Sequence, residues 1–197
     1  MQPVREIVAR GVPLERSDVD TDQIIPSEWL KRVERTGFGE GLFSEWRERS
    51  DFVLNQSRYA DAHILVAGPN FGTGSSREHA VWALMDYGFR AVISSRFADI
   101  FRNNSLKAGL VPVTLPEPVV RTIMAAIDDD AALEIVVDVV DRRVAVPAIG
   151  LDEPFDLDDF TQHRLLEGLD DIGITETHID AVDTFESTRP SYLPTTA

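Results

Sequence analysis

The chain has 197 residues, 43% of them hydrophobic, which predicts a single domain with a buried core and at most a short tail. Its formal net charge of −15 argues against nucleic acid or an anionic membrane surface as partners, and the absence of cysteine excludes disulfides, a thiol nucleophile and thiolate-bound metal. No apolar run reaches the length of a membrane span and residues 1–12 lack the sections of a secretory signal, so we expect a cytosolic protein.

Residues 11–49 are predicted to be largely irregular. Gly11 to Pro26 is polar and turn-rich, and Trp29 to Arg49 mixes basic residues with glycine. Three of these glycines, Gly37, Gly39 and Gly41, fall within five residues, and ordering them would cost too much chain entropy for a regular element. We therefore expect a loop there, flanked by short helices.

The clearest pattern lies between His63 and Leu115, where expected strands and helices alternate. Strands are expected at His63 to Ala67, Ala91 to Ser94 and Val111 to Leu115, and helices at Ser76 to Tyr87 and Phe97 to Leu106. Gly88 and Gly109 are natural helix ends. This alternation favours an α/β layer.

Beyond residue 115, the pattern predicts a helix, a hairpin and two more helices. The helix covers Pro118 to Ile127 and carries one apolar face, made of Val120, Ile123, Met124 and Ile127. The hairpin pairs Glu134 to Val140 with Arg143 to Val146, and the last helices are Phe160 to Leu166 and His178 to Phe185. We expect one domain over residues 1–186 and an extended or disordered tail from Ser187 to Ala197.

A glycine-rich segment from Gly68 to Ala80 joins the first expected strand to the helix that follows. Glycine permits positive φ and a close backbone approach, and a helix start offers free N–H groups, so an anion would be favoured there. Ser75 and Glu78 also have the spacing of a capping box, in which serine caps the helix and glutamate reaches back. The two interpretations are compatible, because the cap needs only one of the two serines, Ser75 and Ser76.

Known nucleotide and hydrolase motifs do not fit this segment. A Walker loop would end in Lys followed by Ser or Thr, which are absent. A dinucleotide-binding Gly-x-Gly-x-x-Gly would need glycine where Arg77 stands, after Gly72 and Gly74. The Gly-x-Ser-x-Gly elbow of hydrolases is absent as well.

Four segments together resemble the swivelling domain of the aconitase family, in that family's order. They are Asp18 to Pro26, Arg35 to Phe38 with Gly41 to Phe43, Gly72 to Ala80, and Ser95 to Asn104, within a motif-bearing core of about residues 11–115. In its length and in the motif Asp-Thr-Asp-Gln-Ile-Ile-Pro, the chain resembles in particular the small subunits of bacterial isopropylmalate dehydratases. The resemblance implies a swivelling β/β/α domain.

The resemblance also implies a hydro-lyase of leucine biosynthesis, which interconverts 2-isopropylmalate and 3-isopropylmalate through isopropylmaleate. Such a reaction needs a base, a Lewis acid for the departing hydroxyl, and donors that hold two carboxylates. The family's Lewis acid is a [4Fe–4S] cluster held by cysteine thiolates. Because this chain has no cysteine, the resemblance implies a large-subunit partner that carries the cluster, with the active site between the two chains.

Residue by residue, the resemblance places the base on Ser75, whose alkoxide the helix start and Arg77 would stabilise. Asp22 matches the family's active-site aspartate. Ser76, Arg77 and Gly74 are expected to bind a substrate carboxylate. No residue of this chain is expected to bind a metal.

The loop from Trp29 to Arg35 resembles the family segment that contacts the variable group and the distal carboxylate of the substrate. Arg35 is the first choice for that contact, with Lys31 and Arg32 behind it. Because substrate choice depends on this loop, a relative of isopropylmalate such as citramalate or a homoaconitate-type acid stays open.

Other interpretations of these residues also stay open. Asp22 fits an Asx turn before Pro26, the basic side chains fit solvated surface charges, and His79 fits a packed or capped histidine. A different function would be a non-catalytic module that holds a small anion on the Gly72 to Ser76 turn and needs no partner. Ser75→Ala separates the two functions, since it abolishes turnover in an enzyme and only weakens binding in a module.

Overall fold

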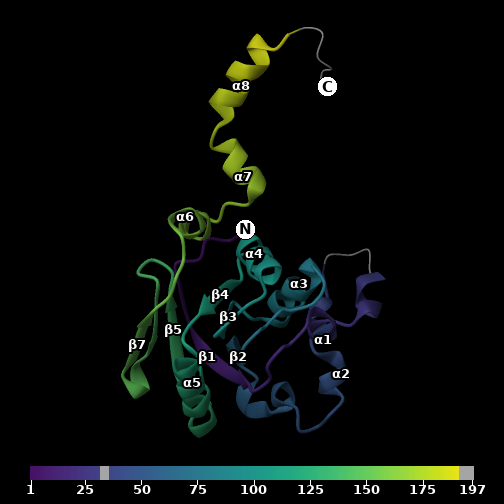
Figure 1. The fold of residues 1–197 in the computed structure, drawn as a ribbon, viewed down its shortest axis with the longest axis vertical. Helices are drawn as coiled ribbons and strands as arrows, with labels where there is room; N and C mark the ends of the chain where they lie inside the picture. Colours follow the sequence, from purple (N-terminus) through teal and green to yellow (C-terminus); the bar gives the residue numbers. More distant parts are fainter. Residues whose placement is uncertain (32–35, 191–197) are drawn as a thin grey trace.

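The computed structural model describes residues 1–31 and 36–190, and its centre is one mixed seven-stranded sheet (Figure 1). The strand order is β4-β3-β2-β1-β5-β6-β7. The strands from β4 to β1 are parallel to one another, whereas β5, β6 and β7 continue the sheet as antiparallel neighbours. The strands are β1 (Glu6–Leu14), β2 (Ala62–Ala67), β3 (Ala91–Ser94), β4 (Val111–Thr114), β5 (Glu134–Asp138), β6 (Arg143–Val146) and β7 (Leu151–Pro154).

Helices pack against strands β1 to β4, and further helices extend beyond the sheet at the C-terminal end (Figure 1). The α-helices are α1 (Thr21–Ile24), α2 (Ser44–Arg47), α3 (Glu78–Tyr87), α4 (Asp99–Ala108), α5 (Glu117–Asp129), α6 (Asp159–Glu167), α7 (Asp171–Glu176) and α8 (Ile179–Thr188). Short 3₁₀ helices are η1 (Ser27–Lys31), η2 (Phe38–Gly41), η3 (Val53–Asn55), η4 (Ser57–Tyr59) and η5 (Pro147–Ile149).

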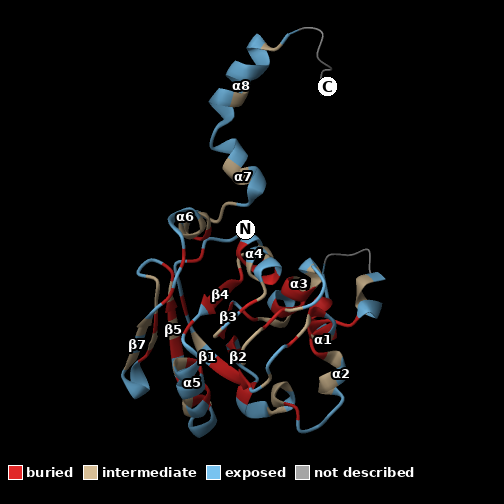
Figure 2. Ribbon diagram, viewed as in Figure 1, coloured by how far each residue is buried: buried red, intermediate tan, exposed pale blue. Residues whose placement is uncertain are grey.

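Between residues 62 and 146 the predicted elements are present, with their ends shifted by at most two residues. Helix α5 buries the predicted apolar face, which consists of Val120, Ile123, Met124 and Ile127. It packs against β1, β2 and β3, and buried residues concentrate along these strands (Figure 2). The hairpin of β5 and β6 also forms as predicted. Local periodicity was informative here because each element has one face that must be covered.

The prediction of an irregular segment from Gly11 onward is wrong at its start. Residues 11–14 belong to β1, which lies between β2 and β5 in the sheet. Pro13 is unusual in such a strand because it lacks an N–H for the ladder. The ladder with β5 covers only Glu6 to Arg10, so Pro13 lies beyond it and no bond to β5 is lost. Val12 and Leu14 are buried.

The predicted capping box at Ser75 and Glu78 does not form. Helix α3 begins two residues later than predicted, at Glu78, and its N-cap Arg77 makes no side-chain cap bond. The capping box lies instead at α1, where Asp20 accepts a hydrogen bond from the N–H of Gln23 and the Gln23 side chain accepts one from the N–H of Asp20. The turn that carries Ser75 and Ser76, here called the serine turn, therefore does not cap helix α3 with a side chain.

The prediction of an irregular loop is also wrong for Phe38–Gly41, which forms η2. Tertiary packing offsets the entropy of ordering its glycines. Phe38 is buried, and its N–H donates to the Asp86 carboxylate of α3 at 3.0 Å. Its ring also contacts His79 and Trp82 on the same helix.

At the C-terminal end, α7 and α8 extend away from the sheet and are largely exposed (Figures 1 and 2). Asp171 at the start of α7 pairs with Lys107 and Arg164 of the body. Helix α8 continues through Thr188, two residues into the expected tail, and residues 191–197 lie outside the described part, so the division at residue 186 stays a prediction. Among the described residues, no helix is both long enough and apolar enough to span a bilayer.

Gly72 provides a test of how tightly the turn after β2 is packed. It has φ +79°, and an added Cβ would lie 2.2 Å from the Phe101 ring. We expect Gly72→Ala to lower the free energy of unfolding by about 2–5 kcal/mol, from backbone strain plus overpacking. Gly150→Ala is the matched control, because Gly150 also has positive φ but meets nothing within 4 Å. That control should lose only about 1–2 kcal/mol. Equal losses in chemical denaturation would contradict the packing argument.

Candidate active site

The turn that follows β2 is held by the segment that follows β1. Because the two strands are parallel neighbours, both segments leave the sheet at the same edge. The N–H of Gly72 donates to the Val19 carbonyl at 2.8 Å, and the N–H of Thr21 donates to the Thr73 carbonyl at 2.9 Å. These bonds join two of the family-like segments, which lie about 50 residues apart in the sequence.

The family-like segment after β3 supports the same turn from a second side. The N–H of Phe71 donates to the Arg96 carbonyl at 3.0 Å, and the N–H of Ala98 donates to the Phe71 carbonyl at 3.1 Å. The buried hydroxyl of Ser94 donates to the Gly68 carbonyl at 2.8 Å. The turn is thus fixed between two neighbouring strand ends.

Of the candidate site residues, Asp22 and Arg77 come together directly. One guanidinium nitrogen of Arg77 donates to the Asp22 carboxylate, which lies on α1. The Arg77 side chain is only 18% exposed, whereas that of Asp22 is 56% exposed. The ion pair therefore holds the guanidinium against α1, while the Asp22 carboxylate remains open to solvent. The local turn role belongs to Asp20, not to Asp22.

Gly74, Ser75 and Ser76 are exposed at the tip of the turn. Neither serine hydroxyl makes a hydrogen bond with any residue that the structure describes. The backbone of Ser75 is nevertheless fixed, because its carbonyl accepts a hydrogen bond from the Thr21 hydroxyl at 3.0 Å. Two free hydroxyls, several free N–H groups and a guanidinium thus lie on one short turn, and these are the groups that bind a carboxylate.

Only part of the basic loop, Trp29 to Arg35, lies within the described residues. Lys31 is exposed at the end of η1 and forms no ion pair or hydrogen bond within the described residues. Arg32 and Arg35 lie outside the described residues. A cavity of about 220 Å³ is lined by the start of η1 together with Asp22 and Glu45.

His79 lies on α3 beside two aromatic rings. Its ring centroid is 5.2 Å from that of Phe38, in edge-to-face geometry, and 4.7 Å from that of Trp82. This corresponds to the packed histidine considered as an alternative. Sequence reasoning did not single out Thr21, although a threonine between two aspartates was visible in the motif.

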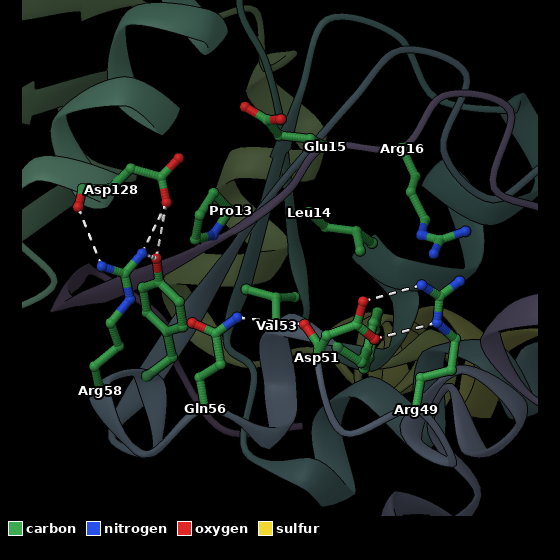
Figure 3. Close-up of a pocket in the computed structure, with 12 residues that line it drawn as sticks. Pro13, Leu14, Glu15, Arg16, Arg49, Asp51, Val53, Gln56, Arg58 and Asp128 are labelled. Atoms are coloured by element: carbon green, nitrogen blue, oxygen red, sulfur yellow. Dashed lines mark hydrogen bonds and ion pairs between the residues drawn. The ribbon is translucent and has the colours of Figure 1, made fainter.

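A separate cavity of about 260 Å³ lies beside the end of β1, and no candidate site residue lines it (Figure 3). Its charges are largely paired internally. Arg49 makes two hydrogen bonds to Asp51 and thereby lowers the pKa of that carboxyl. Asp128 accepts hydrogen bonds from Arg58 and Tyr59. Burial of the Tyr59 side chain is the main cause that raises the pKa of Tyr59, and its hydrogen bond to Asp128 is the second. Because Arg49 and Arg58 are already paired with Asp51 and Asp128, this cavity is not the candidate site.

The donor set of this chain does not fit an iron–sulfur cluster. Such clusters are held by cysteine thiolates, and the chain has no cysteine. In the part of the chain that the structure describes, no three His, Asp or Glu side chains gather as a metal site would need.

Comparison with known proteins agrees with the geometry. Residues 1–118 match the family described as the aconitase C-terminal domain. The chain is 65% identical over 185 residues to a 3-isopropylmalate dehydratase small subunit of Frankia alni, covering 94% of each chain. It is 58% identical over 196 residues to one of Acidothermus cellulolyticus, covering 100% of this chain and 98% of the relative.

A crystal structure of a 3-isopropylmalate dehydratase from Methanocaldococcus jannaschii has the same fold, with a TM-score of 0.67 at 23% identity over 91% of this chain and 98% of the other. The expected swivelling α/β fold of the aconitase family is thereby confirmed. The chain belongs to the aconitase C-terminal domain family and, within it, to the 3-isopropylmalate dehydratase small subunits.

Proposed function

We propose that this chain is the small subunit of a 3-isopropylmalate dehydratase. The enzyme is a hydro-lyase that interconverts 2-isopropylmalate and 3-isopropylmalate through isopropylmaleate, in leucine biosynthesis. The relatives' names supply the reaction. The observation that carries the proposal is that Arg77, on the same turn as the free hydroxyl of Ser75, is held by an ion pair to Asp22 of α1.

Within this turn, Ser75 is the base that takes a proton from the carbon beside a substrate carboxylate. A serine hydroxyl is a weak base at neutral pH, so its alkoxide must be stabilised. The free N–H groups of the turn, the positive end of α3 and the guanidinium of Arg77 supply that stabilisation. In this role the Ser75 hydroxyl needs no hydrogen-bond partner within the protein, and it makes no hydrogen bond with the described residues.

Arg77 binds a substrate carboxylate, with Ser76 and the backbone of Gly74 as further donors. Arginine has several donors in a planar fork, so it can face a carboxylate ligand while it remains bonded to Asp22. Asp22 keeps the fork in one orientation and lowers the entropy lost when the ligand binds. In the basic loop, Lys31, Arg32 and Arg35 are the candidates for the second carboxylate.

This chain supplies only half of the site. A [4Fe–4S] cluster, when bound, supplies the Lewis acid for the departing hydroxyl, and this chain has no thiolate to hold it. We therefore place the cluster on a large subunit, with the turn of Ser75 facing it across the subunit contact. Neither chain would complete the reaction alone.

The first prediction concerns Ser75 and a split site. We would assay turnover of 3-isopropylmalate anaerobically with this chain, with a cluster-loaded large subunit, and with both. Only the mixture should be active. Ser75→Ala should lower kcat of the mixture by about 10²–10⁴-fold, the usual contribution of a general base. The variant should fold normally, because the Ser75 side chain makes no bond to any described residue.

Ser187→Ala is the control, since Ser187 lies on α8 and bonds only to the Thr184 carbonyl among the described residues. It should leave turnover unchanged. Full activity of Ser75→Ala would remove the proposed base. If the wild-type mixture is inactive on isopropylmalate but active on a related hydroxy-dicarboxylate, the substrate assignment fails and the site stands. Dicarboxylate binding by this chain alone, without turnover in any mixture, would favour the binding module.

The second prediction concerns the fork of Arg77. We expect Arg77→Lys to raise KM by about 10–100-fold, because a lysine cannot bond the substrate and Asp22 in one plane. Asp22→Asn keeps an acceptor but removes the charge, so its KM should rise less, by about 3–10-fold. Steady-state kinetics of the reconstituted enzyme measure both.

Arg121→Lys provides the matched control. Arg121 pairs with Glu117 on the exposed side of α5, so it tests the same exchange outside the site. Its KM should equal that of the wild type. If Arg77→Lys also left KM unchanged, Arg77 would be a structural residue and not a substrate ligand.

A further inference from the structure

Thr21 is a buried polar residue beside the serine turn, and the reaction as proposed above gives it no role. It is 2% exposed, and the only other polar residues buried to that degree among those described are Ser94 and Ser105. Thr21 makes two bonds to the turn. Its N–H donates to the Thr73 carbonyl at 2.9 Å, and its hydroxyl donates to the Ser75 carbonyl at 3.0 Å.

These two bonds fix the direction of two peptide planes. The described peptide bonds are trans, and a trans peptide points its carbonyl and the following N–H in opposite directions. With the Thr73 and Ser75 carbonyls turned toward Thr21, the N–H groups of Gly74 and Ser76 must turn away from it. Gly74 has φ +87°, a conformation that other residues rarely adopt.

The two N–H groups have no acceptor within the described residues, and Gly74 and Ser76 are both exposed. Backbone N–H groups that face one side of a turn form a concave site for anions. A carboxylate has two oxygens and accepts such donors well. The ligand chemistry is therefore that of a substrate carboxylate, held by backbone donors next to Arg77.

We infer that Thr21 is a positioning residue: its hydroxyl and N–H orient the backbone donors of Gly74 and Ser76 toward a substrate carboxylate. Thr21 does not touch the substrate, because it is buried behind the turn. This inference rests on the proposed function. It adds to the proposed function that substrate binding depends in part on the Thr21 hydroxyl, although that hydroxyl faces away from the substrate.

The test uses Thr21→Val and Thr21→Ser in the enzyme reconstituted with a cluster-loaded large subunit. Valine keeps the shape and the backbone N–H but removes the hydroxyl, so the peptide between Ser75 and Ser76 can rotate. We expect KM for 3-isopropylmalate to rise about tenfold and kcat to change by no more than about threefold. Thr21→Ser restores the donor, and its KM should lie within about twofold of the wild type.

Ser105→Ala is the matched control for stability. Ser105 is fully buried and its hydroxyl also donates to a backbone carbonyl, that of Phe101, at 2.8 Å within α4. Both Thr21→Val and Ser105→Ala should lower Tm by about 2–4 °C, but only Thr21→Val should raise KM. Equal KM values for the two variants would overturn the inference and leave Thr21 a structural residue.

A measurement on this chain alone keeps the inference testable if the mixture cannot be assayed. The amide NMR signals of Gly74 and Ser76 should shift on titration with malonate, a simple dicarboxylate. In Thr21→Val the same shifts should need about tenfold more malonate. Unchanged titrations would overturn the inference. If the wild-type mixture turns over and Thr21→Val has the same kinetics, the inference is overturned as well. If the wild-type mixture is inactive, the result counts against the proposed function itself.

Discussion

The parallel pairing of β1 with β2 is the constraint on which the candidate site depends. Parallel neighbours end at the same edge of a sheet, and ligands of open α/β sheets bind at the carboxyl ends of strands. The segment after β1 carries Thr21 and Asp22, and the turn after β2 carries Ser75 and Arg77. Sheet pairing brings these two segments, about 50 residues apart in sequence, to within hydrogen-bond distance.

Of the three buried polar side chains among the described residues, two, Thr21 and Ser94, hold this turn. Leaving a buried donor unpaired is costly, so a buried hydroxyl is informative about what it bonds. Ser94 donates to the carbonyl at the start of the turn, and Thr21 donates to the carbonyl of Ser75 near its end. The turn is exposed at its tip and fixed at its base. That arrangement suits a site whose other half must approach from a second chain.

Several elements show where sequence reasoning succeeds and where it fails. Helix α5 was predicted with its correct face, because a spacing of three and four residues specifies a helix locally. Strand β1 was missed because Gly11 and Pro13 weaken the local signal, while its neighbours β2 and β5 stabilise it. The capping box was predicted at Ser75 because the spacing fits, but hydrogen bonds to the Val19 carbonyl and from Thr21 hold the turn in another conformation.

By itself, the sequence determined the family, from four motifs in order, and it determined that this chain has no cysteine with which to hold a cluster. It also singled out the residues of the serine turn as candidates, since glycine and serine before a helix are a local signal. Only the tertiary structure decided that Arg77 bonds Asp22 and that Thr21 holds the carbonyl of Ser75. Those partners lie more than 50 residues apart in the chain, and a contact across that separation is specified by sheet pairing and packing, which no local pattern records.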